Sequence, residues 1–521
     1  MTSSIIPDGA GAQLDFSSLQ SPEAKTYPDE LTLDPVKVRS DSSASDSEYQ
    51  HALEVVFDAD NSHRRRSSLV TSENSPLAKH STAEGRDTTA CFVHHLLERE
   101  RKSRKANAHH LQEINEDTKA DKSVGTNNGQ ATHSRLLTKK QLSDMAWGVR
   151  ELSKRLGSVR LKLRVKTVFL LTKAHDEGLI GYTQEVVEWL LSRDRETPYI
   201  VYVEDTLEHN RVFDAKAIVA KDPSREGRLK YWNNELCTKH PLTFDFVVTL
   251  GGDGTLLYAS WLFQKIVPPV LSFALGSLGF LTKFDYANFP ETLTTAFVDG
   301  VTVSLRLRFE GTVMRSQHKG QHRDLVEELI GVEAENDYTH KPDGSHEILN
   351  DIVVDRGPNP TMSAIELFGD DEHFTTVQAD GVCVATPTGS TAYNLAAGGS
   401  LCHPENPVIL VTAICAHTLS FRPIILPDTI VLRVGVPYDA RTSSWASFDG
   451  RERVELCPGD YVTISASRYP FANVMQQGRR SEDWVNSISR TLNWNSRQKQ
   501  KSFKEWSVDN DDTSGERKAG T

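Results

Sequence analysis

The segment Phe244–Phe263 reads FDFVVTLGGDGTLLYASWLF, and the fold prediction starts from it. A continuous apolar run, Phe244–Leu250, leads directly into the loop Gly251-Gly252-Asp253-Gly254-Thr255, and Leu256–Phe263 follows with helical spacing. Short continuous apolar runs bounded by turn residues are typical of strands that are buried on both faces, as in parallel sheets. The segment therefore predicts a buried strand, a glycine turn and a helix in succession.

Similar units flank this segment. Buried strands are predicted at Thr167–Leu171, Tyr199–Val203 and Val270–Leu275, and helices at Leu137–Lys154 and Gly181–Leu191. Apolar strands that alternate with helices indicate a parallel α/β sheet. We therefore expect an α/β domain with a parallel sheet over residues 136–298.

The pattern changes after residue 298. Apolar and polar residues alternate strictly in Val301–Phe309, which is the period of a half-exposed strand. Further strand-like runs, separated by turn signals such as Asp449-Gly450, occur at Ile348–Val354, Ser363–Phe368, Gly381–Val384, Val408–Val411, Ile430–Val436 and Tyr461–Ser465. An all-β domain is therefore predicted for residues 299–474, and the polar stretch Arg315–His346 is expected to be an irregular surface insertion.

The two ends of the chain are polar. Residues 1–135 contain only isolated apolar side chains, so they are predicted to be a disordered N-terminal tail. In this tail Arg64-Arg65-Arg66 precedes Ser67 and Ser68, so a protein kinase could phosphorylate Ser68; a solvated charge run is the simpler interpretation. Residues 475–521 are expected to be a flexible C-terminal tail.

Composition excludes several classes of protein. The 521 residues include 71 Asp and Glu against 59 Lys and Arg, and this acidic excess argues against a nucleic-acid binder. No apolar run is long enough to span a membrane, and residues 1–20 resemble neither a secretory signal nor a mitochondrial transit peptide, so we expect a cytoplasmic protein. None of the six cysteines forms a CxxC pair, which favours reduced thiols: Cys91, Cys237, Cys383, Cys402, Cys415 and Cys457.

The glycine loop suggests phosphate chemistry. Glycines let the backbone approach a phosphate, and the helix that follows offers free N–H groups and a positive dipole end. Asp253 would repel a phosphate, so it suits a group that handles a proton, holds a hydroxyl or reaches a magnesium ion. A tight turn with a helix-capping Asp is the structural alternative. A second glycine loop, Gly276–Thr282, fits an ordinary turn between strand and helix.

Two polar motifs lie in the predicted β domain. Asn350-Asp351 interrupts an apolar strand, and an amide beside a carboxylate is suited to ribose hydroxyls; a strand-end turn is equally compatible. The run Thr386-Pro387-Thr388-Gly389-Ser390-Thr391-Ala392-Tyr393-Asn394 presents four hydroxyls before a short helix, which suits ribose, amide or phosphate groups. Asp380-Gly381 adds a carboxylate just upstream. The nearby His403 and His417 are interpreted as structural histidines with satisfied ring nitrogens.

Taken together, these motifs resemble the NAD kinase family. The glycine-Asp loop, Asn350-Asp351, Asp380-Gly381 and Thr386–Asn394 follow the family's order and spacing over about residues 140–470. Leu256-Leu257-Tyr258-Ala259-Ser260 and Ser447-Phe448-Asp449-Gly450-Arg451 are closest to eukaryotic members. The family usually has Asn-Glu where this chain has Asn350-Asp351, so its carboxylate is one methylene shorter.

The resemblance implies a Rossmann-like α/β domain followed by a β-sandwich-like NAD-binding domain. It also implies transfer of the γ-phosphoryl group of Mg²⁺-ATP to the 2′-hydroxyl of the adenosine ribose of NAD, in a homo-oligomer. By analogy Asp253 is catalytic, and Gly251, Gly252, Gly254 and Thr255 bind the phosphates. The NAD-binding residues would be Asn350, Asp351, Asp380, Thr388, Thr391, Ala392, Tyr393, Asn394 and Asp449. No residue cluster indicates a protein-held metal.

Two other functions share part of this pattern. A lipid kinase would carry a glycine-Asp loop before a β domain, but would lack the threonine-rich motif. A catalytically inactive NAD-binding regulator would be expected to have a damaged glycine loop, whereas Gly251–Thr255 is intact. The sequence does not choose between NAD and NADH as the acceptor.

Overall fold

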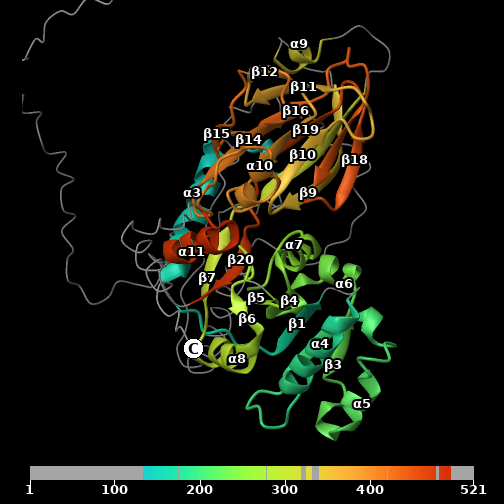
Figure 1. Cartoon of the computed structure of the whole chain (residues 1–521), viewed down its shortest axis with the longest axis vertical. Helices are drawn as coiled ribbons and strands as arrows, with labels where there is room; N and C mark the ends of the chain where they lie inside the picture. Colours follow the sequence, from blue (N-terminus) through green and yellow to red (C-terminus); the bar gives the residue numbers. More distant parts are fainter. Residues whose placement is uncertain are drawn as a thin grey trace, which may run out of the picture. The chain divides into compact units, whose positions relative to one another are not determined.

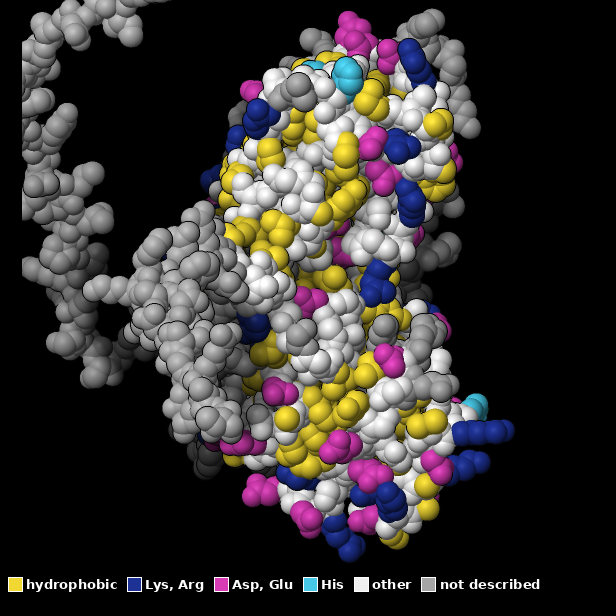
Figure 2. Space-filling model, viewed as in Figure 1, with side chains coloured by type: hydrophobic (Ala, Val, Ile, Leu, Met, Phe, Trp, Pro, Cys, Tyr) yellow, Lys and Arg dark blue, Asp and Glu magenta, His cyan; other side chains and the backbone are white. Residues whose placement is uncertain are grey.

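The computed structural model describes residues 133–158, 160–172, 176–276, 278–317, 324–330, 339–418, 420–476 and 480–494. The predicted disorder of residues 1–132 and the predicted phosphorylation of Ser68 lie outside these ranges. At the first described residues, the backbone N–H of Ser134 donates to Glu310 at 3.0 Å. No helix in the described ranges is both long and apolar enough to cross a membrane. On the face drawn in Figure 2, acidic and basic side chains are interspersed.

The first part of the chain forms an eight-stranded, mostly parallel sheet in the order β3-β2-β1-β4-β5-β20-β7, with β6 paired to β5 (Figure 1). Its strands are β1 (Thr167–Thr172), β2 (Ile200–Glu204), β3 (Leu229–Trp232), β4 (Phe246–Gly251), β5 (Val270–Ala274), β6 (Phe284–Asp285), β7 (Thr302–Arg306) and β20 (Phe471–Met475). After β1 the chain adds β2 and β3 on one side of this strand, and then returns to add β4 and β5 on its other side. The strand order therefore reverses at β1. Ligands of doubly wound sheets bind beyond the carboxyl ends of the strands at such a reversal.

Helices pack on this sheet and connect its strands. Buried apolar residues of α4, β1 and β4 share one core, and those of α7 join a second core with β1, β4 and β5. The described helices are α3 (Lys139–Ser158), α4 (Glu177–Leu190), α5 (Ala215–Ala220), α6 (Asn234–Lys239), α7 (Asp253–Leu262), α8 (Phe289–Val298), α9 (Leu325–Ile330), α10 (Tyr393–Ala396) and α11 (Arg480–Leu492).

Two six-stranded antiparallel sheets form the second part. One has the order β15-β14-β13-β10-β17-β18, and the other β12-β11-β16-β19-β8-β9. Apolar side chains from both sheets fill one core, which makes this part a β-sandwich. Its strands are β8 (Phe309–Ser316), β9 (His340–Ile348), β10 (Asp351–Asp355), β11 (Ser363–Gly369), β12 (Glu372–Ala379), β13 (Gly381–Ala385), β14 (Val408–Ile414), β15 (Ile424–Pro427), β16 (Leu432–Gly435), β17 (Ser444–Phe448), β18 (Glu452–Leu456) and β19 (Tyr461–Ala466).

The sandwich is inserted between two neighbouring strands of the first sheet. β7 precedes it in the chain and β20 follows it, and the two pair antiparallel, with Asn473 opposite Ser304. β20 also lies parallel to β5. The predicted α/β and all-β classes are therefore confirmed, and the sheet of the first part includes two strands from the predicted range 299–474.

Two local expectations differ from the structure. Arg315–His346 was expected to be irregular, but His340–Ile348 form β9, paired with β8. The polar side chains of β9 are mostly exposed at the edge of a sheet, so its sequence lacks the apolar alternation of a half-buried strand. Within the predicted flexible tail 475–521, Arg480–Leu492 form the helix α11. Trp484, Ser487 and Ile488 have the i, i+3, i+4 spacing of one helix face, and Ser487 and Ile488 are buried there.

Candidate active site

The glycine-Asp loop lies at the carboxyl end of β4, beside the point where the strand order reverses. Gly251 ends the strand with φ 153°, and a Cβ there would come within 2.3 Å of the Thr255 hydroxyl. Glycine is therefore required for the tight turn between strand and helix. Gly252 and Gly254 are exposed at the start of α7, so a phosphate could approach the helix N-terminus.

The carboxylate of Asp253 is gripped by the second glycine loop. Its Oδ1 accepts from the N–H of Leu281 at 3.1 Å, and from the N–H and hydroxyl of Thr282 at 2.9 and 3.0 Å. Its Oδ2 accepts from the N–H of Phe280 at 2.9 Å. Each carboxylate oxygen accepts about two hydrogen bonds. Oδ1 already has three donors and Oδ2 has one, so the side chain is firmly oriented and a further partner must come to Oδ2.

This contact corrects the interpretation of the second glycine loop as an ordinary turn. Gly279 lies so close to Asp253 that a Cβ on it would be 2.2 Å from Oδ1. The hydroxyl of Thr282 also accepts from the N–H of Gly279 at 3.1 Å, which closes the loop on itself. The loop Gly279–Lys283 therefore acts as a cradle for Asp253, a role that depends on tertiary contact and leaves no local signal in the sequence.

Asn350 and Asp351 lie at the bend where β9 gives way to β10, rather than inside one strand. Asp449 holds this bend from a distant hairpin: its carboxylate accepts from the N–H groups of Leu349, Asn350 and Asp351 at 2.9, 2.8 and 3.1 Å. Asp449 and Gly450 have φ values of 48° and 65°, as a tight hairpin turn requires. Asp449 therefore fixes the backbone that carries the predicted NAD-binding pair.

Two buried carboxyl groups lie together at this bend. Burial and, to a smaller extent, the negative charge of Asp449 together raise the pKa of Asp351 to about 7. Burial also raises the pKa of Asp449, whereas its three N–H donors act in the opposite direction. The charge of Asp351 therefore changes near neutral pH.

The threonine-rich motif packs against the same bend. The N–H of Thr386 donates to the carbonyl of Asn350 at 2.8 Å, and its hydroxyl donates to the carbonyl of Leu349 at 2.6 Å. Thr388–Thr391 then form a short 3-10 helix, and α10 begins at Tyr393. This arrangement brings Asn350-Asp351 and Thr386–Asn394 together, as the family resemblance implies.

The remaining predicted residues of this motif differ in exposure. Tyr393 is 45 % exposed, and Thr391 and Ala392 are half-buried, so all three can reach a ligand. Asn394 is fully buried, and its side chain bonds the carbonyls of Ser390 and Ser400 and the hydroxyl of Thr412. Asn394 therefore holds the motif in shape from within the fold.

Two arginines join the motifs. Arg451, directly after the Asp449-Gly450 turn, donates to the carbonyl of Gly254 at 3.2 Å, and its guanidinium lies 4.4 Å from the ring centre of Tyr258. The hairpin of the sandwich thus contacts the first turn of α7. Arg356 donates to the carboxylate of Asp380 at 2.9 Å, so Asp380 is oriented by an ion pair at the start of β13.

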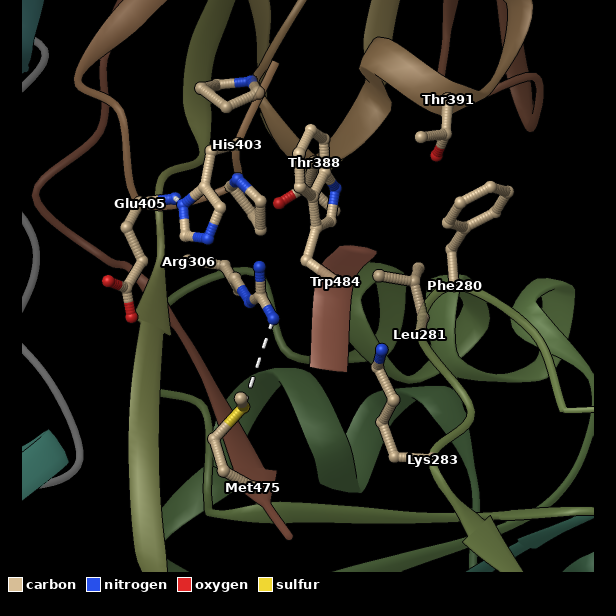
Figure 3. A pocket seen from close by; sticks show the side chains of 12 residues that line it. Phe280, Leu281, Lys283, Arg306, Thr388, Thr391, His403, Glu405, Met475 and Trp484 are labelled. Atoms are coloured by element: carbon tan, nitrogen blue, oxygen red, sulfur yellow. Dashed lines mark hydrogen bonds between the residues drawn. The ribbon is translucent and has the colours of Figure 1, made fainter. Parts of the chain in front are cut away.

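A small, partly open pocket lies where these parts meet. Figure 3 shows that its lining comes from the Asp253 cradle, from β7 and β20, from the threonine-rich motif and from α11. Its lining residues are Phe280, Leu281, Lys283, Arg306, Pro387, Thr388, Thr391, His403, Pro404, Glu405, Met475 and Trp484. Two predicted NAD-binding residues, Thr388 and Thr391, therefore face the loop that holds the predicted catalytic residue.

The hydroxyl of Thr388 and Nε2 of His403 are buried atoms of this pocket, and neither has a hydrogen-bond partner among the described residues. Nδ1 of His403 accepts from the N–H of Glu405 at 3.2 Å, so in the neutral ring Nε2 carries the proton and is a donor. Because buried polar groups are normally paired, both atoms are suited to a polar ligand. The described residues therefore pair only one ring nitrogen of His403, whereas the sequence interpretation expected both to be satisfied.

The sequence interpretation missed several pocket residues. Lys283, Arg306 and Glu405 supply charges, and Trp484 supplies an aromatic face. None of them stands in a recognisable motif, because each comes from a separate element that only the tertiary fold brings to the pocket. In the described parts of the chain, no group of three or more His, Cys, Asp or Glu side chains is placed to hold a metal ion.

Known proteins share this sequence and fold. A NAD(+) kinase of Saccharomyces cerevisiae is 45 % identical over 363 residues, which cover 70 % of this chain and 66 % of that protein. An ATP-NADH kinase of the same yeast is 42 % identical over 360 residues, which cover 69 % of this chain and 70 % of that protein. An uncharacterized kinase of Schizosaccharomyces pombe is 45 % identical over 355 residues, which cover 68 % of this chain and 86 % of that protein. Yeast NADH kinase, solved in complex with NADH, superposes with a TM-score of 0.52 at 28 % identity, covering 65 % of this chain and 91 % of that structure.

A glycine-Asp loop on a doubly wound sheet, joined to a hydroxyl-rich motif of a β-sandwich, defines a two-domain phosphotransferase with a hydroxyl acceptor. The model of the ATP-NAD kinase N-terminal domain matches residues 168–301, and that of the ATP-NAD kinase C-terminal domain matches residues 349–476. The chain belongs to the NAD kinase family. This membership decides against the lipid-kinase alternative.

Proposed function

We propose that the chain transfers the γ-phosphoryl group of ATP to the 2′-hydroxyl of the adenosine ribose of NAD. The bond from the ribose oxygen to the γ-phosphorus forms, the bond from that phosphorus to the bridging oxygen of ADP breaks, and the hydroxyl proton is released. The proposal rests on the observation that one loop, Gly279–Lys283, both binds the Asp253 carboxylate and lines the pocket that contains Thr388 and Thr391.

In this proposal Asp253 aligns the acceptor hydroxyl. A ribose hydroxyl is a weak nucleophile, and phosphoryl transfer depends chiefly on alignment and charge neutralisation. Four donors orient the carboxylate, and the remaining acceptor position on Oδ2 can receive the hydroxyl or its proton. The exposed backbone of Gly252 and Gly254, with the N-terminus of α7, would neutralise phosphate charge.

The dinucleotide would lie against the sandwich side of the site. The hydroxyl of Thr388, which has no partner within the described ranges, offers a hydrogen bond, and Thr391, Ala392 and Tyr393 offer further accessible surface. Asn350 and Asp351 would bind ribose hydroxyls, with Asp380 at the nicotinamide side. Asp449 and Asn394 would support these residues through the backbone contacts described above.

Magnesium would arrive with ATP. Mg²⁺ keeps several water ligands and is usually bound through substrate phosphates and one or two carboxylates. The described residues offer the single carboxylate of Asp253 and the pair Asp351 and Asp449 rather than a group of three or more. The protein would therefore orient the metal-nucleotide complex without holding the ion by itself.

Turnover of purified protein with Mg²⁺-ATP tests the proposal. We expect Asp253→Asn to keep dinucleotide binding, measured by calorimetry, but to lose at least about 100-fold in kcat, since alignment and proton handling both fail. Assays with NAD and with NADH, run in parallel, identify the acceptor. A chain that binds NAD but forms no NADP would be an inactive regulator. Wild-type turnover of Asp253→Asn would refute the role of Asp253.

Three finer predictions rest on the sequence: a homo-oligomer, a cytoplasmic location and phosphorylation at Ser68. Light scattering on the purified chain would give its mass in solution. Imaging of a tagged full-length chain would give its compartment. Mass spectrometry of the protein from cells would detect a phosphate on Ser68.

A further inference from the structure

Helix α11 lies beyond the part of the chain that the family domains cover, since the C-terminal domain match ends at residue 476. Nevertheless α11 contacts the site. Its Trp484 lines the pocket and lies edge-on to His403, with ring centres 5.2 Å apart. Ser487 and Ile488, one turn further, are buried. Figure 3 shows the end of α11 that carries Trp484 entering the pocket region.

The inner face of α11 is bonded to the cradle of Asp253. The ammonium group of Lys283 donates to the hydroxyl of Ser487 at 2.9 Å, and both side chains are buried. Arg490 makes a longer contact, 3.5 Å, with the carbonyl of Gly279 at the other end of the cradle. Gln476, after β20, donates to the carbonyl of Lys283. The C-terminal segment therefore holds both ends of the loop Gly279–Lys283.

This loop is the one that orients the catalytic carboxylate. The N–H groups that Asp253 accepts belong to Phe280, Leu281 and Thr282, all between the two ends that α11 holds. Loss of the Ser487 hydroxyl would remove one hydrogen bond of the buried Lys283 ammonium group and weaken the link between α11 and the cradle. Movement of Lys283 would shift the adjacent Thr282, which bonds Asp253 through two groups.

We propose that α11 is a positioning element for phosphoryl transfer, acting from Ser487 through Lys283 and the cradle on Asp253. The inference rests on the proposed role of Asp253. Ser487 is buried and does not line the pocket, so its influence should fall on the rate of the chemical step. Poor alignment of the reacting groups lowers kcat. Loss of a contact that binds the substrate and the transition state equally raises KM instead.

The test compares two serines of the same helix in the full chain. Ser487→Ala should lower kcat about fivefold, with KM for ATP and for the dinucleotide within about twofold of wild type. Ser489→Ala, an exposed position two residues away, is the matched control and should leave all three values unchanged. Arg490→Ala, also at an exposed position, should lower kcat about twofold without disturbing folding. Thermal unfolding of each variant is measured beside the kinetics.

The outcomes separate the two proposals. A kcat of Ser487→Ala equal to that of Ser489→Ala would overturn the positioning role, as would a raised KM for the dinucleotide with unchanged kcat. A fall in melting temperature with unchanged kcat would also overturn it, because α11 would then be purely structural. Asp253→Asn is assayed alongside: if it loses turnover and Ser487→Ala does not, only the inference about α11 fails. If Asp253→Asn keeps turnover, the proposed function of Asp253 fails.

Discussion

At Gly279 the absence of a side chain controls the position of a carboxylate. Because the position of a Cβ would lie 2.2 Å from Oδ1 and 2.6 Å from Cγ of Asp253, an alanine must displace the carboxylate. The carboxylate cannot move without losing some of its four donors. The geometry of Asp253 is thus set as much by what Gly279 lacks as by what the following residues donate.

We therefore expect Gly279→Ala to lower kcat about tenfold or more, equivalent to about 1.4 kcal/mol of activation free energy. Gly181→Ala is the matched control, because nothing lies within 4 Å of a Cβ in that position of α4. The control should raise the free energy of unfolding by about 0.5–1 kcal/mol, since alanine favours the helix, and keep full activity. Initial rates and denaturant unfolding check both variants. Full turnover of Gly279→Ala would contradict the cradle.

Asp351 makes stability depend on pH. Its pKa is about 7 in the folded chain, against the ordinary value of 3.8, because of burial and the facing carboxylate of Asp449. Between these values the folded state keeps a proton that the unfolded state has lost. The free energy of unfolding therefore falls as pH rises from about 4 to about 7, by at most about 1.4 kcal/mol per pH unit, and levels off above.

Asp351→Asn removes this titration, so its stability relative to wild type should increase from pH 5 to pH 7 and stay constant above. Urea unfolding at several pH values measures the difference. Asp299→Asn, at an exposed position after α8, provides the control and should show no such trend. A difference between Asp351→Asn and wild type that does not change with pH would show that Asp351 titrates at its ordinary pKa.

At the scale of elements, α7 is anchored at both ends. Asp253 begins it in the cradle, and Arg308, fully buried, closes its other end. The guanidinium donates to the carbonyls of Phe263 and Lys265 at 2.8 Å each and of Ser260 at 3.3 Å. The last carbonyls of a helix lack partners within it, and a cation there also interacts favourably with the helix dipole.

Arg308→Met should therefore lower the free energy of unfolding by about 3 kcal/mol or more, because several buried carbonyl groups lose their donors at once. Burial lowers the pKa of Arg308 to about 10, so the side chain is still charged at neutral pH. Lys265→Met removes an exposed cation nearby and should change stability by less than about 0.5 kcal/mol. Denaturant titration compares the two. Equal stability of both variants would contradict the anchoring role.

The elements also show what the sequence could predict. The apolar runs at Phe244–Leu250 and Val270–Leu275 predict β4 and β5 correctly, because strands buried on both faces have a local signature. Strand β18, with three charged residues in Glu452–Leu456, has no such signature and depends on its pairing with β17. The structure brings the predicted motifs Asn350-Asp351 and Thr386–Asn394 into contact. The residues that hold these motifs in place cannot be predicted from a local pattern. Asp449, for example, accepts a hydrogen bond from Asn350, which lies 99 positions away in the sequence.

At the scale of the whole described chain, the two parts are joined by more than their linkers. Arg451 of the sandwich contacts the glycine loop, and Thr388 and Phe280 line one pocket from opposite parts. α11 contacts both, through Lys283 on one side and His403 on the other. Residues proposed to bind each substrate are therefore placed by contacts from the other part, so the proposed site is complete only when both have folded.

The insertion of the sandwich between β7 and β20 has a consequence for synthesis. A ribosome releases the chain from its N-terminus, at about 5–20 residues per second, and domains generally fold in that order. Here β5 and β7 emerge early, but the strand that lies between them ends at Met475. The first sheet must wait, with a gap between these two strands, until almost the whole sandwich has been translated. The part that is made first is thus finished last, and a nascent chain stalled before Phe471 would display an open sheet edge that chaperones recognise.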